Sequence, residues 1–393
     1  MRRLVIQARV WLVRAAFALA SALPLQPYVV LATSLSRIGG NLAAIHDELR
    51  TRYGGRVVTL VHDARPGPGG RLRAVMHALE AGYHLARARV FVVDSHYVPV
   101  YVVRPRPGTT IAQTWHASGA IKRIGYSVVG KDFGADETLV SVVRLHANYT
   151  LCLAASRAAA LQFVDAFRQP ISLFRTDLGI PKTDVLFGER AIHAERAVRE
   201  RYAIPDGRRV ILYAPTFRGH SLVAARHPQG LDLVAMARRL SDDHVLLLRS
   251  HPAVRLRPRL DPSVASFVID VSGHPEINEL LLITDVLVSD YSSVVFDFAL
   301  LGRPMAFFAP DYDDYERERG FYFDYRSTLP GPVFETTDDL ADYLRTGALD
   351  TDRVRRFAAD WFEVADGQAS ARFVDRVVLP GLEARERVDD GDH

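Results

Sequence analysis

The chain has 393 residues, of which 48% are hydrophobic and 24% are charged. This length suits two α/β domains of ordinary size, and the composition excludes a disordered, collagenous or fully coiled-coil protein. The single cysteine excludes an internal disulfide and a cysteine-rich metal site, and a formal net charge of only +3 gives no reason to expect a nucleic-acid partner.

The first predicted segment is residues 1–26, MRRLVIQARVWLVRAAFALASALPLQ. Its uncharged run at 15–25 is too short to span a bilayer. Helical spacing gathers the arginines in one half of the helix and apolar side chains such as Leu4, Trp11 and Leu19 in the other. We interpret residues 1–26 as a basic amphipathic helix on an anionic membrane surface, with an ordinary packed helix and a signal peptide as alternatives.

Short hydrophobic runs then alternate with helical patterns, which is typical of a parallel β-sheet with helical crossovers. We expect strands at 28–33, 56–61, 90–93 and 109–114, a helix at 42–51 that Asn41 caps, and a helix at 71–88. The pattern predicts one α/β domain over residues 27–190.

A charged stretch at about 188–206 predicts a helical linker, after which the alternation restarts. The second set of elements comprises strands at 210–214, 244–248, 267–271, 285–289 and 304–308, with helices at 276–284 and 292–301. These elements predict a second α/β domain over residues 205–350. A last helical region within 351–384 is long enough to return to the first domain.

Unusual polar residues follow the strands of both predicted sheets. Loops at the carboxyl ends of parallel strands are where such folds bind ligands, so these residues form the candidate site. The strand that ends at Thr114 precedes His116, Ser118, Lys122 and Arg123; strands of the second domain precede Thr216 and Arg218, Arg249 and His251, and Asp290, Ser292 and Ser293. Four such loops indicate a shared site.

The residue types suit a nucleotide and its phosphates. Ser292 and Ser293 open a predicted helix, where hydroxyls and free amide groups bind an anion or simply cap the helix. Asp297 follows one turn later and suits a ribose diol, unless it is a solvated helix charge. His116 and His251 stand at strand ends of opposite domains, so one can act as a base and the other can contact phosphate, unless both are structural.

Four basic residues, Lys122, Arg123, Arg218 and Arg249, can neutralise phosphate oxygens, although in such an arginine-rich chain they can also be ordinary surface charges. The sequence contains no HExxH motif, and we expect no dedicated metal site. It also contains no GxSxG motif and no Walker loop.

Several of these segments, taken in order from Gln113 to Arg372, resemble motifs of the CDP-glycerol glycerophosphotransferase family of teichoic acid synthesis. The similar segments are QTWHASGAIKRIG at 113–125, LGIPKTD at 178–184, ILYAPTFR at 211–218, LRSHP at 248–252, and residues 270–325 with SDYSSV at 289–294. Two positions depart from the family pattern: Ala117 stands where most members have glycine, and Lys182 where they have arginine.

The resemblance implies an α/β, GT-B-like fold, in which two Rossmann-like domains face a central cleft and the donor binds mainly in the second. It implies transfer of a polyol phosphate, glycerol phosphate first and ribitol phosphate second, from a CDP-activated donor to a hydroxyl group, with release of CMP. The CDP-polyol is a co-substrate, no tightly bound cofactor is implied, and a divalent-metal requirement stays open.

The implied acceptor is a lipid-linked saccharide or polyol phosphate of a teichoic-acid-like cell-wall or capsule polymer. Because the CDP donor is cytoplasmic and the acceptor is lipid-linked, the expected location is the cytoplasmic face of the plasma membrane, with the enzyme peripheral.

The family pattern also assigns roles to residues. His116 is the expected general base, and His251 the expected diphosphate partner. The expected donor-binding residues are Thr216, Arg218, Arg249, Glu279, Asp290, Ser292, Ser293 and Asp297. The expected acceptor or phosphate contacts are Ser118, Lys122, Arg123 and Lys182.

Two other functions stay open at this point. A GT-B glycosyltransferase that uses a nucleotide sugar would share the fold but release a nucleoside diphosphate instead of CMP. A non-catalytic protein that binds a nucleotide or a polyol phosphate would keep Ser292 and Asp297 but tolerate the loss of His116.

Overall fold

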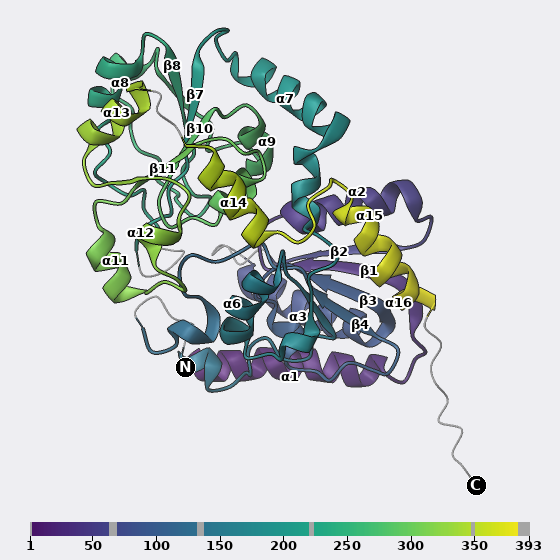
Figure 1. Ribbon diagram of the computed structural model, residues 1–393. Helices are drawn as coiled ribbons and strands as arrows, with labels where there is room; N and C mark the ends of the chain where they lie inside the picture. The colour runs from purple at the N-terminus through teal and green to yellow at the C-terminus, as the bar shows by residue number, and fades with distance from the viewer. Residues whose placement is uncertain (1, 63–68, 132–136, 220–223, 347–349, 384–393) are drawn as a thin grey trace.

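Two parallel six-stranded sheets organise the chain (Figure 1). The structure is a computed structural model that describes residues 2–62, 69–131, 137–219, 224–346 and 350–383. We call residues 2–187, which carry the first sheet, the N-terminal half, and residues 209–346, which carry the second, the C-terminal half. The expected α/β class with two parallel sheets is confirmed.

The first sheet has the strand order β2-β1-β3-β4-β5-β6, with all neighbours parallel. Its strands are β1 (Gln26–Thr33), β2 (Val57–Val61), β3 (Ala88–Val93), β4 (Thr110–Gln113), β5 (Leu151–Leu153) and β6 (Phe174–Arg175). The helices of this half are α1 (Arg2–Ala20), α2 (Gly40–Arg52), α3 (Gly70–Arg87), α4 (Val98–Tyr101), α5 (Glu137–Val140) and α6 (Arg157–Phe167). Central strands such as β1 are continuous apolar runs because helices cover both faces of the sheet.

Helix α7 (Gly188–Tyr202) connects the halves, as expected of the charged stretch. The second sheet has the order β12-β11-β10-β7-β8-β9 and is also parallel throughout. Its strands are β7 (Arg209–Tyr213), β8 (His244–Leu248), β9 (Val268–Asp270), β10 (Val286–Ser289), β11 (Met305–Phe308) and β12 (Val333–Phe334). The helices are α8 (Leu233–Leu240), α9 (Ile277–Leu282), α10 (Val294–Ala299), α11 (Tyr312–Glu318), α12 (Tyr325–Thr328) and α13 (Thr337–Thr346).

Two local expectations need correction. Helix α2 begins at Gly40 with Gly39 as its N-cap, so Asn41 lies inside the helix and does not cap it. Helix α10 covers only six residues, because its regular turns begin after Ser293 and end before Leu300. Both serines therefore precede the helix.

The last helices return to the N-terminal half but are not continuous. They are α14 (Asp352–Trp361), α15 (Ala369–Phe373), a π-helical turn at 374–378 and α16 (Leu379–Glu383), with non-helical chain at 362–368. Helix α15 packs against α2, and α16 packs against β1 and β3 (Figure 1). Residue 384, the end of the expected segment, lies outside the described residues.

Helix α1 packs along α3 beneath the first sheet (Figure 1). The two backbones come close at Gly82, where an added Cβ would lie 2.4 Å from the carbonyl oxygen of Val13. The packed side of α1 carries Val10, Val13 and Ala20, which are buried. None of the described helices is both long and apolar enough to span a lipid bilayer.

Candidate active site

A strained turn after β4 presents His116. Trp115 has a φ of +50°, a left-handed conformation that costs a non-glycine residue energy and persists only when its surroundings hold it. Its amide N–H donates to Oε1 of Gln113 at 2.8 Å, and its carbonyl accepts from Nδ2 of Asn41 at 2.8 Å. The indole is buried, whereas the next side chain, His116, is exposed. The turn therefore places His116 outside the core.

The imidazole of His116 is oriented by the end of β3. Its Nδ1 lies 3.2 Å from the backbone carbonyl oxygen of Asp94, so Nδ1 carries the hydrogen in the neutral ring and Nε2 keeps its lone pair. Although solvent reaches the side chain, surrounding protein atoms lower the pKa of His116 to about 4, and Lys182 and Lys122 add to this effect. At neutral pH the ring is uncharged and able to accept a proton.

His251 follows β8 in the C-terminal half. Its Nδ1 accepts from the amide N–H of Ala253 at 3.1 Å, which leaves Nε2 to carry the hydrogen of the neutral ring. Burial lowers the pKa of His251 to about 3, and Lys122, His116 and Arg249 contribute. Since Lys122 and His116 belong to the N-terminal half, the structure brings the two predicted histidines together at the junction of the halves.

Lys122 crosses this junction. Its backbone forms an antiparallel bridge with Phe321, and its ammonium group lies near Arg319, Asp290 and Arg218. Burial, together with the two arginines, lowers the pKa of Lys122 to about 7, although Asp290 opposes this shift. An ammonium group in such a cationic surrounding favours an anionic ligand.

Arg123, next to Lys122 in the sequence, binds the backbone of the C-terminal half. Its amide N–H donates to the carbonyl of Gly320 at 3.0 Å, and its Nε donates to the carbonyl of Phe321 at 3.3 Å. The guanidinium also lies over the ring of Tyr322, 5.7 Å from its centroid. Arg123 therefore joins the two halves and has a structural role besides the expected phosphate contact.

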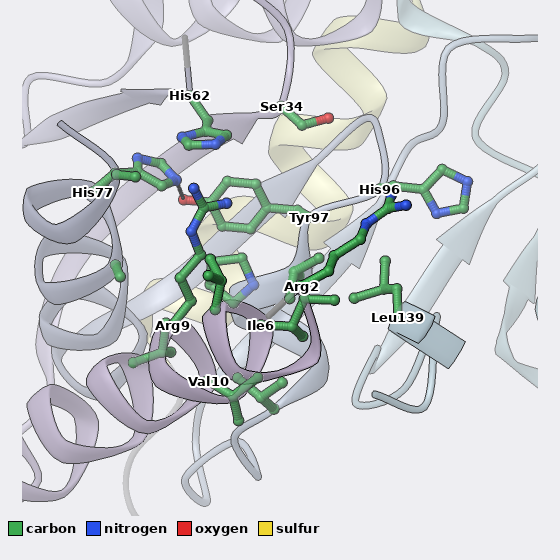
Figure 2. A pocket seen from close by; sticks show the side chains of 17 residues that line it. Arg2, Ile6, Arg9, Val10, Ser34, His62, His77, His96, Tyr97 and Leu139 are labelled. Atoms are coloured by element: carbon green, nitrogen blue, oxygen red, sulfur yellow. Dashed lines mark hydrogen bonds between the residues drawn. The ribbon is translucent and has the colours of Figure 1, made fainter. Parts of the chain in front are cut away.

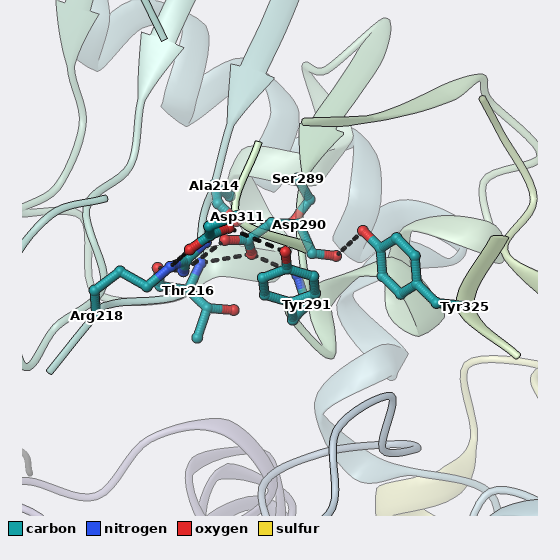
Figure 3. A network of polar contacts seen from close by, with 8 residues as sticks. All are labelled: Ala214, Thr216, Arg218, Ser289, Asp290, Tyr291, Asp311 and Tyr325. Carbon is teal, nitrogen blue, oxygen red and sulfur yellow. Dashed lines mark hydrogen bonds and ion pairs between the residues drawn. The ribbon is translucent and has the colours of Figure 1, made fainter. Parts of the chain in front are cut away.

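A buried network around Asp290 fixes the loops after β7 and β10 (Figure 3). Oδ1 of Asp290 accepts from the amide N–H groups of Thr216 at 2.7 Å and Tyr291 at 2.6 Å. Arg218 pairs with Oδ2 of Asp290 at 2.9 Å and with Asp311 at 2.6 Å. Arg218 therefore binds two carboxylates and, with Asp290, fixes these loops, while the donor contact expected of both residues stays a prediction.

Two polar atoms of the predicted donor site are buried without a partner among the described residues. They are Oγ1 of Thr216 and Nε of Arg249. The other end of the Arg249 guanidinium is used, because Nη1 donates to the carbonyl of Ser272 at 2.5 Å. Buried polar atoms are nearly always hydrogen-bonded, so these two have unused capacity for a ligand.

Asp297 is occupied by residues of the other half. It is 1% exposed, and its two oxygens accept from Ser118 Oγ at 2.5 Å and from Lys182 Nζ at 2.5 Å. The backbone of Lys182 is also held, since its N–H donates to Oδ1 of Asn41 at 2.9 Å and its carbonyl accepts from Asn278. All three side chains therefore join the halves, while the ribose contact of Asp297 and the ligand contacts of Ser118 and Lys182 stay predictions.

Of the three remaining predicted donor residues, two are serines with few hydrogen bonds and one is a glutamate that pairs with a histidine. Oγ of Ser292 accepts from the amide N–H of Val294 at 3.4 Å, and Ser293 makes no side-chain cap. Both serines are partly exposed. Glu279 lies 2.8 Å from Nε2 of His274, so it pairs with a histidine of its own half.

Sequence reasoning missed three residues that shape the turn around His116. Asn41 and Gln113 hold Trp115, and the Asp94 carbonyl orients the imidazole. The sequence position of Asp94 could have indicated a role at the site, since Asp94 follows a predicted strand as His116 does. Gln113 begins the family-like segment at 113–125, but the partners of Asn41 and Gln113 are defined only by the tertiary fold.

The described residues contain no group of three or more histidine, cysteine or acidic side chains that could hold a metal ion.

The sequence profile of the CDP-glycerol:poly(glycerophosphate) glycerophosphotransferase family matches residues 15–379. The chain belongs to this family. The expected family is thereby confirmed, and the match includes every predicted site residue.

Two curated relatives of this glycerophosphotransferase family come from Bacillus spizizenii. The chain is 37% identical over 316 residues to the teichoic acid poly(ribitol-phosphate) polymerase, an alignment that covers 79% of this chain and 50% of that protein. It is 35% identical over 311 residues to the teichoic acid ribitol-phosphate primase, with 77% of each covered. The chain thus spans about half the length of the polymerase and about three quarters of the primase.

A solved structure of the wall teichoic acid polymerase TagF has a similar fold. The TM-score is 0.79 at 25% sequence identity, and the superposition covers 97% of this chain and 96% of that one. The likeness therefore extends over both sheets and the junction between them.

Proposed function

We propose that this protein transfers a polyol phosphate from a CDP-polyol to a hydroxyl group of a teichoic-acid-like acceptor, with release of CMP. One observation carries the proposal: His116 and Lys122 of the N-terminal half lie near enough to His251 of the C-terminal half to affect its protonation, in a chain of this family. This supports the proposal, because a transfer between two substrates requires a neutral base and phosphate-binding groups close together.

The reaction is a substitution at the β-phosphorus of the donor. The acceptor oxygen forms a new P–O bond as the bond between the β-phosphorus and CMP breaks, and CMP leaves with the electron pair of that bond. Nε2 of His116 takes the proton of the attacking hydroxyl. Since such transfers depend mainly on positioning and charge neutralisation, the groups that hold the diphosphate matter as much as the base.

The diphosphate is assigned to four groups. Lys122 supplies positive charge from the N-terminal half, while His251, Thr216 and Arg249 donate from the C-terminal half. The unpaired atoms of Thr216 and Arg249 support this assignment, because a phosphate oxygen would satisfy both. Ser292 and Ser293 are proposed as further donor contacts, since both are partly exposed near the loop that Asp290 fixes.

The proposal includes the arrangement of the two domains and the side on which each substrate binds. Two Rossmann-like domains, residues 27–190 and 205–350, face each other in a GT-B-like arrangement, and the helices of 351–384 return to the first. The acceptor binds on the side of His116 and the donor mainly in the second domain. The ion pair between Lys182 and Asp297 supports this division, because it joins the two domains beside the site.

Both relatives described above are named for ribitol phosphate, so the relatives favour a ribitol donor over the glycerol donor that the sequence motifs suggested first. We therefore expect CDP-ribitol to give a higher kcat/KM than CDP-glycerol.

The location proposed is the cytoplasmic face of the plasma membrane, with the protein peripheral and its acceptor lipid-linked. The outward side of α1 exposes Leu4 (68%), Trp11 (66%) and Leu19 (79%). Neighbouring α3 exposes Leu72 and Met76, and arginines such as Arg3 flank the apolar stripe on α1. An apolar stripe bordered by arginines suits an anionic membrane surface.

The test is to incubate the protein with a lipid-linked acceptor and either CDP-glycerol or CDP-ribitol, and to measure CMP. Release of CMP that depends on the acceptor is expected. Parallel incubations with nucleotide sugars address the alternative glycosyltransferase, which would release a nucleoside diphosphate. Release of a nucleoside diphosphate, or no CMP with either donor, would contradict the proposal.

A further inference from the structure

A pocket of about 350 Å³ lies between α1, α3 and the segment that begins α4 (Figure 2). This volume is at the lower end of the roughly 300–1,000 Å³ typical of small-molecule sites. Its wall is mainly apolar, with Ile6 and Val10 from α1, Ala74 and Ala78 from α3, and Val98 beside α4. The lining includes no residue of the Asp290 network and none of the four groups assigned to the diphosphate.

Polar groups stand on one side of this apolar wall. Nε2 of His77 lies 3.1 Å from the hydroxyl of Tyr97, and the rings of His77 and His62 are 4.5 Å apart. Arg2 and Arg9 of α1 also line the pocket (Figure 2). Burial lowers the pKa of His77 to about 4, so at neutral pH the positive charge comes from the arginines.

The pocket joins two surfaces that the proposed function uses. Val5 lines it and is 49% exposed on α1, beside the apolar stripe that faces outward. At the other end His96 lines it, and the ring of His96 lies 5.2 Å from that of Trp115. His96 is also near enough to His116 to influence its protonation. The pocket thus extends from the proposed membrane face to the turn that presents the base.

We propose that this pocket binds the lipid end of the acceptor, with the apolar chain against Ile6, Val10 and Ala78 and the adjoining phosphate beside Arg2 and Arg9. The inference rests on the proposed function, since it names how that acceptor is held. An amphiphile with one chain and an anionic head matches both the apolar wall and the arginines. Its saccharide or polyol portion would then continue past His96 toward His116.

The first experiment measures binding directly, with farnesyl diphosphate as the probe and calorimetry as the readout. Two variants disturb the pocket: Arg9→Gln removes a charge, and Val98→Trp fills the space. Each has a matched control outside the pocket, Arg3→Gln on the opposite flank of α1 and Val75→Trp on the exposed side of α3. We expect Arg9→Gln and Val98→Trp each to weaken binding about tenfold or more, and the controls to bind as the wild type does.

Short-chain phosphatidylglycerol and inorganic diphosphate serve as competitors in the same assay. The proposal expects neither to displace farnesyl diphosphate at equal concentration. Equal displacement by phosphatidylglycerol would assign the pocket to bulk membrane lipid and overturn the proposal. Binding that Arg9→Gln and Val98→Trp leave unchanged would overturn it as well, and thermal unfolding confirms that each variant is folded.

The second experiment separates this inference from the proposed function. CMP release is measured with a lipid-linked acceptor and with the same acceptor without its lipid. We expect Val98→Trp to raise the KM for the lipid-linked acceptor about tenfold while the lipid-free acceptor is used as before. Equal effects on both acceptors would overturn the pocket proposal. A wild-type protein that releases no CMP with either acceptor would instead contradict the proposed function. The binding assay would still show whether the pocket binds farnesyl diphosphate.

Discussion

Lys182 and Asp297 form a buried ion pair across the two halves of the protein, with 2.5 Å between Nζ and a carboxylate oxygen. Breaking such a pair leaves a buried charge without its partner, which costs about 3–5 kcal/mol. We therefore expect Asp297→Asn to lower the free energy of unfolding by about this amount, measured by urea denaturation.

The matched control for this variant is Asp314→Asn, which breaks an exposed pair with Arg317. Exposed pairs contribute about 0–1 kcal/mol, so the control should unfold almost as the wild type does. If Asp297→Asn kept its stability but lost affinity for CDP, the carboxylate would be a ribose ligand after all.

Replacing each of the two histidines with alanine should change the rate and the donor affinity in different ways. His116→Ala should reduce single-turnover CMP release by about 10²–10⁴-fold and leave donor affinity nearly unchanged, because a general base acts mainly in the transition state. His251→Ala should lose both rate and donor affinity, since it contacts charge that is present before the reaction. Donor titration beside single-turnover kinetics distinguishes the two, with His193→Ala on the exposed side of α7 as the control. More than about a tenth of the wild-type rate in His116→Ala would remove the base assignment.

Donor binding should depend on pH through Lys122. The pKa of this lysine is lowered to about 7, so part of the population is uncharged above that pH. A diphosphate favours the charged form and raises the pKa, which means that binding takes up a proton and that affinity falls as the pH rises above about 7. Calorimetry in buffers of different ionisation enthalpy measures the uptake. Lys122→Arg keeps the positive charge at all these pH values, so this variant should lose most of the proton uptake on donor binding. An unchanged proton uptake in Lys122→Arg would mean that another group takes up the proton.

Membrane attachment should depend on the outward side of α1. Trp11 is 66% exposed, so Trp11→Glu should leave the fold intact and weaken binding to anionic vesicles about tenfold or more, since burial of such a side chain contributes roughly 1.5–3 kcal/mol. Vesicle co-sedimentation provides the measurement. Ile192→Glu, at an equally exposed apolar position on α7, is the control. Equal effects of the two variants would mean that charge alone, and not the stripe on α1, governs attachment.

Most of the fold could be predicted from the sequence because central parallel strands are buried on both faces and appear as continuous apolar runs. The sequence does not predict strands β5, β6 and β12, since they have only two or three residues and leave almost no pattern. The sequence predicts one helical region at the C-terminus, because the break at 362–368 depends on tertiary contacts such as that of the Glu363 N–H with the Ala155 carbonyl.

The candidate site was predictable in its position but less so in the roles of its residues. Sequence order places His116 and His251 at strand ends, and the parallel sheets then bring both to the junction. It could not indicate that Asp297 pairs with Lys182, which lies 115 positions earlier in the chain. Nor could it reveal which polar atoms stay unpaired, as Oγ1 of Thr216 does, because that depends on every neighbour in the folded state.

The close approach of α1 to α3 at Gly82 has a mechanical consequence. The carbonyl of Val13 would lie 2.4 Å from any added Cβ, so the two backbones are in direct contact and α1 cannot shift sideways without displacing α3. A bilayer that holds the outward side of α1 would therefore hold the first sheet rigidly as well. His116 would then stand at a constant height above the lipid headgroups, and only acceptors whose hydroxyl reaches that height could be extended.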